Sequence, residues 1–361
     1  MNPSLDALLK DPLFQLNAVL WLTRPLPSGE RISPILHTKG FSVYAIAPLL
    51  GPPPEVRLAA EEAGVRMQER LRPDVVLTHE ATGKFAFLEC KAHSFGTDSS
   101  TSEQARGLLV VAGPKCAEVL ALAPQQVSGS LLTFVTPESH REQLGQTLSA
   151  LVQELQDHGL PAGPSSVLGM AADDSNICLV TDDDACEFFS LPSGCHAFLK
   201  REEGTDPRPL YFIPYDPDVA QSEEERIFCK RVLFERIQSG ILAAVGHAHP
   251  PTELTLEAYG MLNDAMFGVY GQWENRESGQ HMRRLCRQLV DAIAHAVNSA
   301  AEGAIVSEPG KGWRVLLDDQ DQQDKVTDAL ERFSCETFDL AAEPAAELFG
   351  DPEGAAPEPA N

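Results

Sequence analysis

Three charged side chains, those of Asp74, Glu89 and Lys91, have the types and the spacing that hydrolysis of a phosphodiester with a divalent metal requires. Asp74 begins an apolar run directly after Pro73, and Glu89 and Lys91 close a second run. Since side chains alternate along a strand, Glu89 and Lys91 should face one side and Cys90 the other. Two carboxylates can hold a hard cation such as Mg²⁺ or Mn²⁺, and the lysine can orient or deprotonate the attacking water.

The element that must position these side chains is a predicted β-hairpin. The apolar runs Pro73–Leu77 and Lys84–Glu89 flank the turn-like stretch His79–Gly83. A helix over Glu55–Leu71 is expected before the hairpin, with an apolar face at helical spacing. A second helix is expected after it, opened by the capping-box pattern Ser100-x-x-Glu103 and running to about residue 112.

The residue pattern resembles the active-site hairpin of the PD-(D/E)XK nuclease superfamily, over roughly residues 55 to 136. Pro73-Asp74 matches the P-D, and Glu89-Cys90-Lys91 is the only D/E-x-K in the chain. The resemblance implies a restriction-endonuclease-like fold, with Asp74, Glu89 and the backbone carbonyl of Cys90 as metal ligands and Lys91 positioning the water. The other interpretation is an ordinary strand that ends in solvated charges.

Further site residues follow from the resemblance. A helix before the Asp strand often supplies an extra acidic residue, for which Glu61 is the preferred candidate over Glu62. A Gln or an Arg in the helix after the hairpin contacts the active site in several subfamilies, and Gln104 and Arg106 stand there. The helix N-terminus itself could hold a phosphate. His93, two residues past Lys91, could contact the substrate, but a loop histidine is the simpler interpretation. For Glu61, Glu62 and Gln104 the alternative is an ordinary solvated side chain.

The order of elements predicts an α/β fold: a restriction-endonuclease-like mixed sheet flanked by helices, followed by a mainly helical C-terminal region. Further strands are expected at 41–46, 130–135, 176–181, 187–191, 197–200 and 209–213, and further helices at 117–122 and 138–158. The predicted organisation is an N-terminal extension packing on the core (1–54), the nuclease-like core (55–160), a β-rich extension (161–215), a helical domain (216–340) and a disordered acidic tail (341–361).

The C-terminal half offers weaker motifs. Helices expected at 218–245, 252–270 and 278–301 precede a two-stranded hairpin and a last helix, an order that resembles a winged-helix arrangement. Arg283, Arg284 and Arg287 form a basic cluster that could contact a nucleic-acid backbone, or simply pair with local acids. The triplet Asp182-Asp183-Asp184 could hold a second metal ion, but an acidic hairpin turn is the simpler interpretation.

Charge is divided unevenly along the chain. The net charge is −25, yet residues 1–110 hold 11 Lys/Arg and 12 Asp/Glu, which leaves 17 and 41 for the rest. Such acidity disfavours a free-standing DNA binder and predicts a partner subunit or a homo-oligomer. The eight cysteines lack a C-x-x-C pattern, and the sequence shows no signal peptide or membrane-length apolar run. We therefore expect a cytoplasmic protein with free thiols and no membrane association.

These patterns predict a Mg²⁺- or Mn²⁺-dependent endonuclease with DNA as its substrate. Family-level analogy suggests a prokaryotic restriction-type or anti-phage defence complex. A second hypothesis is a non-catalytic scaffold that keeps the fold and binds partners through its acidic half. A nucleotide-binding enzyme is disfavoured, because Gly310-Lys311-Gly312 lacks the glycine spacing and the Ser/Thr of a phosphate-binding loop.

Overall fold

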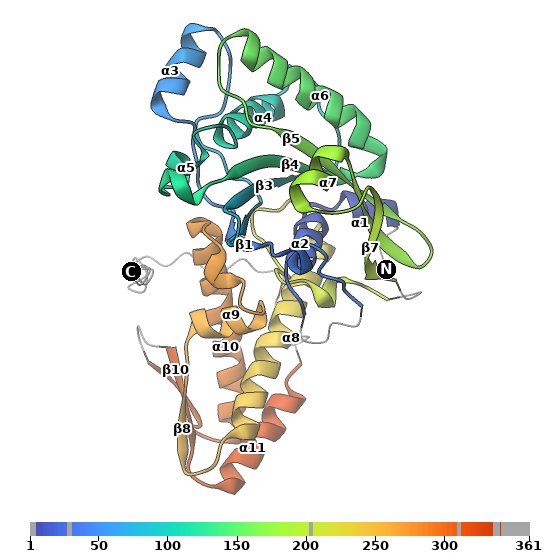
Figure 1. Cartoon of the computed structure of the whole chain (residues 1–361). Helices are drawn as coiled ribbons and strands as arrows, with labels where there is room; N and C mark the ends of the chain where they lie inside the picture. The colour runs from blue at the N-terminus through green and yellow to red at the C-terminus, as the bar shows by residue number, and fades with distance from the viewer. Residues whose placement is uncertain (1–4, 27–30, 202–204, 309–311, 335–339, 341–361) are drawn as a thin grey trace. The chain divides into compact units, whose positions relative to one another are not determined.

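The computed structural model describes residues 5–26, 31–201, 205–308, 312–334 and 340 (Figure 1). The chain divides into two compact units. Unit 1 runs to Pro207 and also takes Gln272–Asn275, and unit 2 holds the rest. The predicted tail, residues 341–361, lies outside the described residues. No helix in the described ranges has both the length and the apolar composition needed to cross a membrane.

Unit 1 is built on a seven-stranded mixed sheet in which every strand pairs with its neighbours in the sequence. Strands β1 to β3 are antiparallel, β3 to β5 are parallel, and β5 to β7 are again antiparallel. The two parallel steps place the carboxyl ends of β3 and β4 at one edge. The strands are β1 (Ser42–Ile46), β2 (Val75–His79), β3 (Lys84–Cys90), β4 (Gly129–Pro137), β5 (Ser165–Ala172), β6 (Asn176–Thr181) and β7 (Gly194–Lys200).

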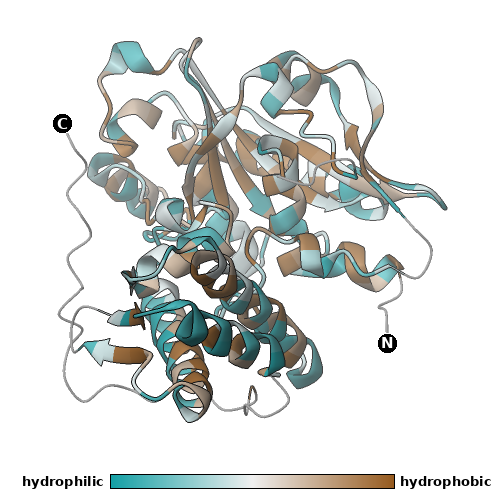
Figure 2. Ribbon diagram, turned by 90° about the horizontal axis from the view of Figure 1, so that it is seen from below, coloured by the Kyte–Doolittle hydropathy of each residue, from teal (hydrophilic) through white to brown (hydrophobic). Residues whose placement is uncertain are grey.

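Helices cover both faces of this sheet. In Figure 1, α3, α4 and α6 lie above it and α1 and α2 below it. In the hydrophobic core on the upper face of the sheet, Val76, Phe87 and Phe134 pack with the buried leucines of α6. The strand side chains that point to the other face are covered by α1 and α2. Figure 2 shows that the strands are largely hydrophobic. The helices of the unit are α1 (Leu5–Lys10), α2 (Pro12–Thr23), α3 (Pro54–Glu62), α4 (Ser100–Val111), α5 (Cys116–Val119), α6 (Glu138–Asp157) and α7 (Asp183–Phe189).

The α/β class expected from the sequence is confirmed, and two elements of unit 1 differ from prediction. The helix predicted over 55–71 ends at Glu62, because Gly64 takes a left-handed conformation (φ 71°) and the chain then turns to pair Leu71 with Leu50. The stretch predicted as a strand at 187–191 instead forms the end of helix α7, which stops at Phe189, and the turn that follows it. Asp182 caps that helix by accepting from the Ala185 N–H (2.8 Å), so the aspartate triplet begins a helix, not a hairpin turn.

Unit 2 has the element order helix, strand, helix, helix, strand, strand, helix. Its elements are α8 (Glu223–His247), β8 (Thr252–Leu256), α9 (Ala258–Ala265), α10 (Arg276–Ala300), β9 (Ile305–Glu308), β10 (Gly312–Leu317) and α11 (Gln320–Arg332). The three strands form an antiparallel sheet in the order β8-β10-β9. The helix predicted over 252–270 is wrong at its start, because residues 252–256 alternate between more and less exposed positions and pair with β10. Residues 208–210 form a short 3-10 helix where a strand was expected at 209–213.

Candidate functional site

Asp74 and Glu89 face each other across β2 and β3. The ladder pairs Val75 with Leu88 and Val76 with Phe87, so one further step places Asp74 opposite Glu89 on the face that α4 and α6 cover. Directly opposed side chains have Cβ atoms about 4.5–5.5 Å apart, and like charges at such a position destabilise a sheet. The backbone pairing therefore brings together two carboxylates that repel each other.

Glu89 is a buried carboxylate with one oxygen satisfied. It is 3% exposed, and its Oε1 accepts from Lys91 Nζ (2.7 Å) and from Gln104 Nε2 (2.8 Å). Its Oε2 has no hydrogen-bond partner. Burial, followed by the charge of Asp74, raises the pKa of Glu89 to about 7, against the opposing effects of Lys91 and Gln104. A buried, unsatisfied oxygen beside a second carboxylate is an arrangement that a cation would stabilise.

Lys91 supplies the positive charge nearest to Glu89. Its backbone N–H continues the ladder by donating to the Val135 carbonyl (2.8 Å), and its ammonium also donates to Gln104 Oε1 (3.2 Å). Burial lowers the pKa of the Lys91 ammonium, but attraction to Glu89 and the hydrogen bond with it outweigh burial, so the pKa is raised. Lys91 is therefore a cation in this arrangement.

Gln104 comes to the site on the second turn of α4. The N-cap of this helix is Ser99, whose side chain accepts from the Ser102 N–H (3.1 Å). The capping box predicted at Ser100 and Glu103 is therefore wrong, because the N-cap lies one residue earlier, at Ser99. The resulting phase turns the Gln104 amide toward Glu89 and Lys91, where it donates to the first and accepts from the second.

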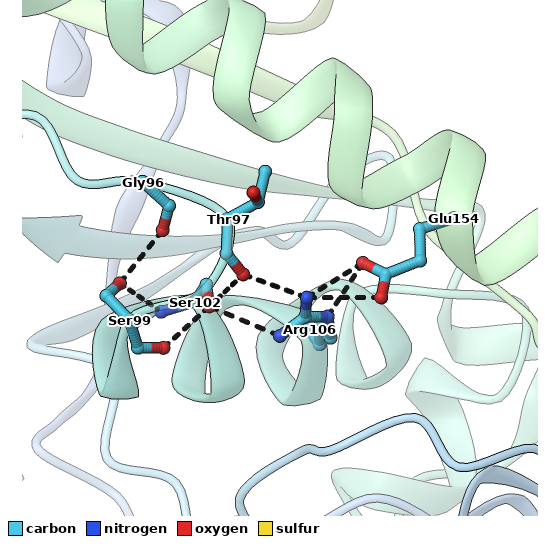
Figure 3. Close-up of polar contacts among 6 residues, drawn as sticks. All are labelled: Gly96, Thr97, Ser99, Ser102, Arg106 and Glu154. Atoms are coloured by element: carbon cyan, nitrogen blue, oxygen red, sulfur yellow. Dashed lines mark hydrogen bonds and ion pairs between the residues drawn. The ribbon is translucent and has the colours of Figure 1, made fainter.

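Arg106, on the same helix, has a structural role, because its side chain bonds to neighbouring parts of unit 1 (Figure 3). Its guanidinium forms a two-pronged contact with Glu154 of α6 (2.9 and 3.1 Å) and donates to the Thr97 carbonyl (2.9 Å) and to Ser102 Oγ (3.2 Å). It is 7% exposed. Arg106 thus ties the loop after β3, helix α4 and helix α6 together, which fixes the helix that carries Gln104.

Pro73 changes the hydrogen bonding at the end of β3. Continuing the ladder places Pro73 opposite Cys90 at a hydrogen-bonded position, and proline has no N–H to donate to the Cys90 carbonyl. The Cys90 N–H, which would donate to the Pro73 carbonyl in a regular ladder, donates to Asp74 Oδ2 (2.6 Å). The Pro-Asp pair therefore fixes the Asp74 carboxylate and leaves the Cys90 carbonyl without a donor from its ladder partner.

A second proline has a similar effect on β4. In the parallel ladder the carbonyl of Lys91 should accept from residue 137, which is Pro137 and has no N–H. The amide of Gln15 on α2 takes this role and donates to the Lys91 carbonyl (3.2 Å) and to the Leu9 carbonyl (2.8 Å). Gln15 is fully buried, and α2 is mostly apolar apart from Gln15, Asn17 and Thr23. No role was predicted for Gln15 from the sequence, where an amide within an apolar run was the available signal.

Three other residues belong to this edge of the sheet or to the predicted site. Thr136 follows Val135 on β4 and so lies beside Lys91, with a buried hydroxyl that has no hydrogen-bond partner. His93 packs edge-on against His140 of α6 (ring centroids 5.3 Å apart). Glu61 is exposed on α3, and its role stays a prediction.

The oxygen donors of the site fit a hard cation. Asp74, Glu89 and the Cys90 carbonyl offer oxygen atoms alone, the donor type that Mg²⁺ and Mn²⁺ prefer, and the unsatisfied Glu89 Oε2 is among them. Within the part of the chain that the structure describes, three or more His, Cys, Asp or Glu side chains nowhere gather as a metal-binding group. A metal here would therefore depend on two carboxylates and a backbone carbonyl.

Comparison with known proteins adds no family assignment. No protein-family model, no curated protein and no solved structure matches this chain.

Proposed function

We propose that this protein is a metal-dependent endonuclease of the restriction-endonuclease-like type, acting on DNA. The observation that carries the proposal is the opposed pair Asp74 and Glu89, with one buried carboxylate oxygen unsatisfied and Lys91 on the other oxygen at 2.7 Å. Three antiparallel strands, then helix α4 and a parallel fourth strand, are consistent with the core that the resemblance implies. The same resemblance suggests a role in a defence or restriction-type complex.

Each side chain has a role in this proposal. Mg²⁺ or Mn²⁺ held by Asp74, Glu89 and the Cys90 carbonyl would supply Lewis acidity for phosphodiester hydrolysis. Lys91, as a cation, orients the attacking water and offsets negative charge that builds on the phosphate. Gln104 holds the Lys91 and Glu89 side chains in one geometry through its two hydrogen bonds. Its role is positioning.

Unit 2 supports a nucleic-acid setting without defining it. Its order of elements and its strand order β8-β10-β9 are consistent with the winged-helix arrangement that the sequence resembles. Arg283, Arg284 and Arg287 stand on α10, each half-buried. The acidity of this half argues that a partner subunit, or a second copy, helps to bring DNA to unit 1.

The proposal is tested by cleavage and by metal binding in parallel. Plasmid and linear duplex DNA are incubated with the purified full chain and Mg²⁺ or Mn²⁺, with chelator controls. We expect Lys91→Ala and Asp74→Asn to reduce cleavage on the order of 1,000-fold. The first removes the cation that offsets charge on the phosphate, and the second removes a carboxylate that would hold the metal. Lys84→Ala, which removes a half-buried lysine from the other end of β3, is the matched control and should cleave normally.

Metal binding gives a readout that does not need the right substrate. Mn²⁺ should raise the unfolding temperature of the wild type and of Lys91→Ala, but not that of Asp74→Asn. Full cleavage by Asp74→Asn or Lys91→Ala would refute the assignment. Absence of both Mn²⁺ binding and cleavage in the wild type would favour the non-catalytic scaffold instead.

A further inference from the structure

We propose that unit 2 carries a docking groove for a basic amphipathic helix of a partner protein. The groove is a cavity of about 670 Å³ between α8, β8 and α9, and every residue that lines it belongs to unit 2. Its floor includes Val232, Ile237, Ile241, Leu256 and Met261. The proposal is independent of the nuclease assignment for unit 1.

The dimensions of the groove suit a helix. Its lining on α8 runs from Val232 to Ala244, which at the rise of an α-helix is a length of about 18 Å. That is enough for about three turns of a partner helix that buries residues at i, i+3, i+4 and i+7. A site for a small molecule normally has several polar groups that converge on the ligand, whereas the acidic residues that line this groove are exposed to solvent.

The rim has one sign of charge. Glu235, Glu257 and Asp264 line the groove and are exposed. Arg236 is the cation among the described lining residues, and its guanidinium already donates to the carbonyls of Ala265 (2.9 Å) and Pro209 (2.7 Å) and stacks on the Phe267 ring. An occupant should therefore present lysines or arginines beside its apolar stripe.

The same charge argument excludes two other occupants. A second copy of this chain would bring a net charge of −25 to an acidic rim. The C-terminal stretch 341–361 contains five Asp/Glu and no Lys or Arg, so it too has the wrong sign for this surface. A heterologous partner with a basic helix remains, which agrees with the partner that the acidity of this half predicts.

Two helical glycines make the groove open. Gly240 lies within α8 and Gly260 within α9, and both line the groove. Among the described residues, a Cβ at either position would meet no atom within 4 Å. Glycine is a poor helix former, and packing within the chain does not require it here. Their absent side chains leave room for a close approach by another backbone.

The test uses an 18-residue peptide of leucines at helical spacing with lysines elsewhere, added to the full chain. Controls are a peptide with the same leucines and glutamates for lysines, and a scrambled leucine/lysine peptide. Fluorescence polarisation should give at least tenfold tighter binding for the leucine/lysine helix than for either control. Charge reversal by Glu257→Lys with Asp264→Lys should weaken binding at least tenfold and reduce its dependence on salt.

Substitution of the glycines separates groove binding from general attraction to an acidic protein. Gly240→Leu fills the groove and should weaken binding of the peptide at least tenfold. Gly246→Leu makes the same change in the same helix outside the groove, where a Cβ also meets nothing within 4 Å, and should leave binding unchanged. Equal binding of the scrambled peptide, or an unaltered affinity in Gly240→Leu, would overturn the proposal. Binding of an apolar dye that Gly240→Leu abolishes, without any preference among the peptides, would overturn it in favour of a small apolar ligand.

Discussion

Helix α4 carries two polar clusters that differ in whether their buried charges are satisfied. Around Arg106, the guanidinium donates to the Glu154 carboxylate, the Thr97 carbonyl and the Ser102 hydroxyl, so each of its three nitrogens has an acceptor (Figure 3). Around Gln104, two residues earlier, the Glu89 carboxylate keeps one oxygen unsatisfied and faces Asp74. The first cluster stabilises the fold, and the second keeps a local electrostatic cost that a bound cation would relieve.

The largest stability effect should come from breaking the satisfied cluster. Arg106→Met should lower the free energy of unfolding by about 3 kcal/mol, because it leaves a half-buried Glu154 and two acceptors without their donor. Urea unfolding followed by tryptophan fluorescence reports this mainly through Trp21 and Trp273 of unit 1. Arg57→Met, which removes an exposed ion pair with Glu69, is the control and should cost less than about 1 kcal/mol.

The unsatisfied cluster should respond in the opposite direction. The folded pKa of Glu89, about 7, lies above its ordinary value of 4.5, so the native state holds this proton more tightly than the unfolded state. The stability from that proton is fully present below about pH 4.5 and is lost as the pH rises to about 7. Without metal, Glu89→Gln should therefore gain on the order of 2 kcal/mol over the wild type at pH 8 and nothing at pH 4.

The quantity to compare is the difference in stability between the wild type and Glu89→Gln at each pH. Burial raises the pKa of Asp216 in unit 2 to about 6, so both proteins share a second pH dependence. Subtracting the profile of Glu89→Gln from that of the wild type removes this shared contribution. If Glu89→Gln were less stable than the wild type at pH 8, Glu89 would belong with Arg106 as a stabilising group.

The smallest effect concerns the support of the site. Gln15→Leu should destabilise unit 1 by about 1–2 kcal/mol, because the Lys91 and Leu9 carbonyls lose their donor. Pro137→Ala returns an N–H to the ladder opposite the Lys91 carbonyl. In the Pro137→Ala background, the cost of Gln15→Leu should fall to about half in the same unfolding experiment. An unaltered cost would show that Gln15 acts through its packing alone.

Local sequence patterns correctly predicted the elements whose structure depends on neighbouring residues. The hairpin of β2 and β3, helix α6 and the strand at 176–181 follow from alternation or helical spacing of apolar residues, and the structure has them within a few residues of the expected bounds. Helix α3 ends early, at Glu62, because Gly64 takes a left-handed conformation. Residues 252–256 form a strand because pairing with the distant β10 outweighs local propensity.

The sequence by itself determined which side chains of the hairpin share a face, since alternation along a strand places Glu89 and Lys91 on the same side whatever the rest of the chain does. Only the tertiary structure decided the phase of α4 that aims Gln104 at them, the anchoring role of Arg106, and the use of Gln15 to replace the donor that Pro137 lacks. These contacts join residues as much as 76 positions apart, so no local pattern encodes them; they arise when helices from both sides pack on one sheet.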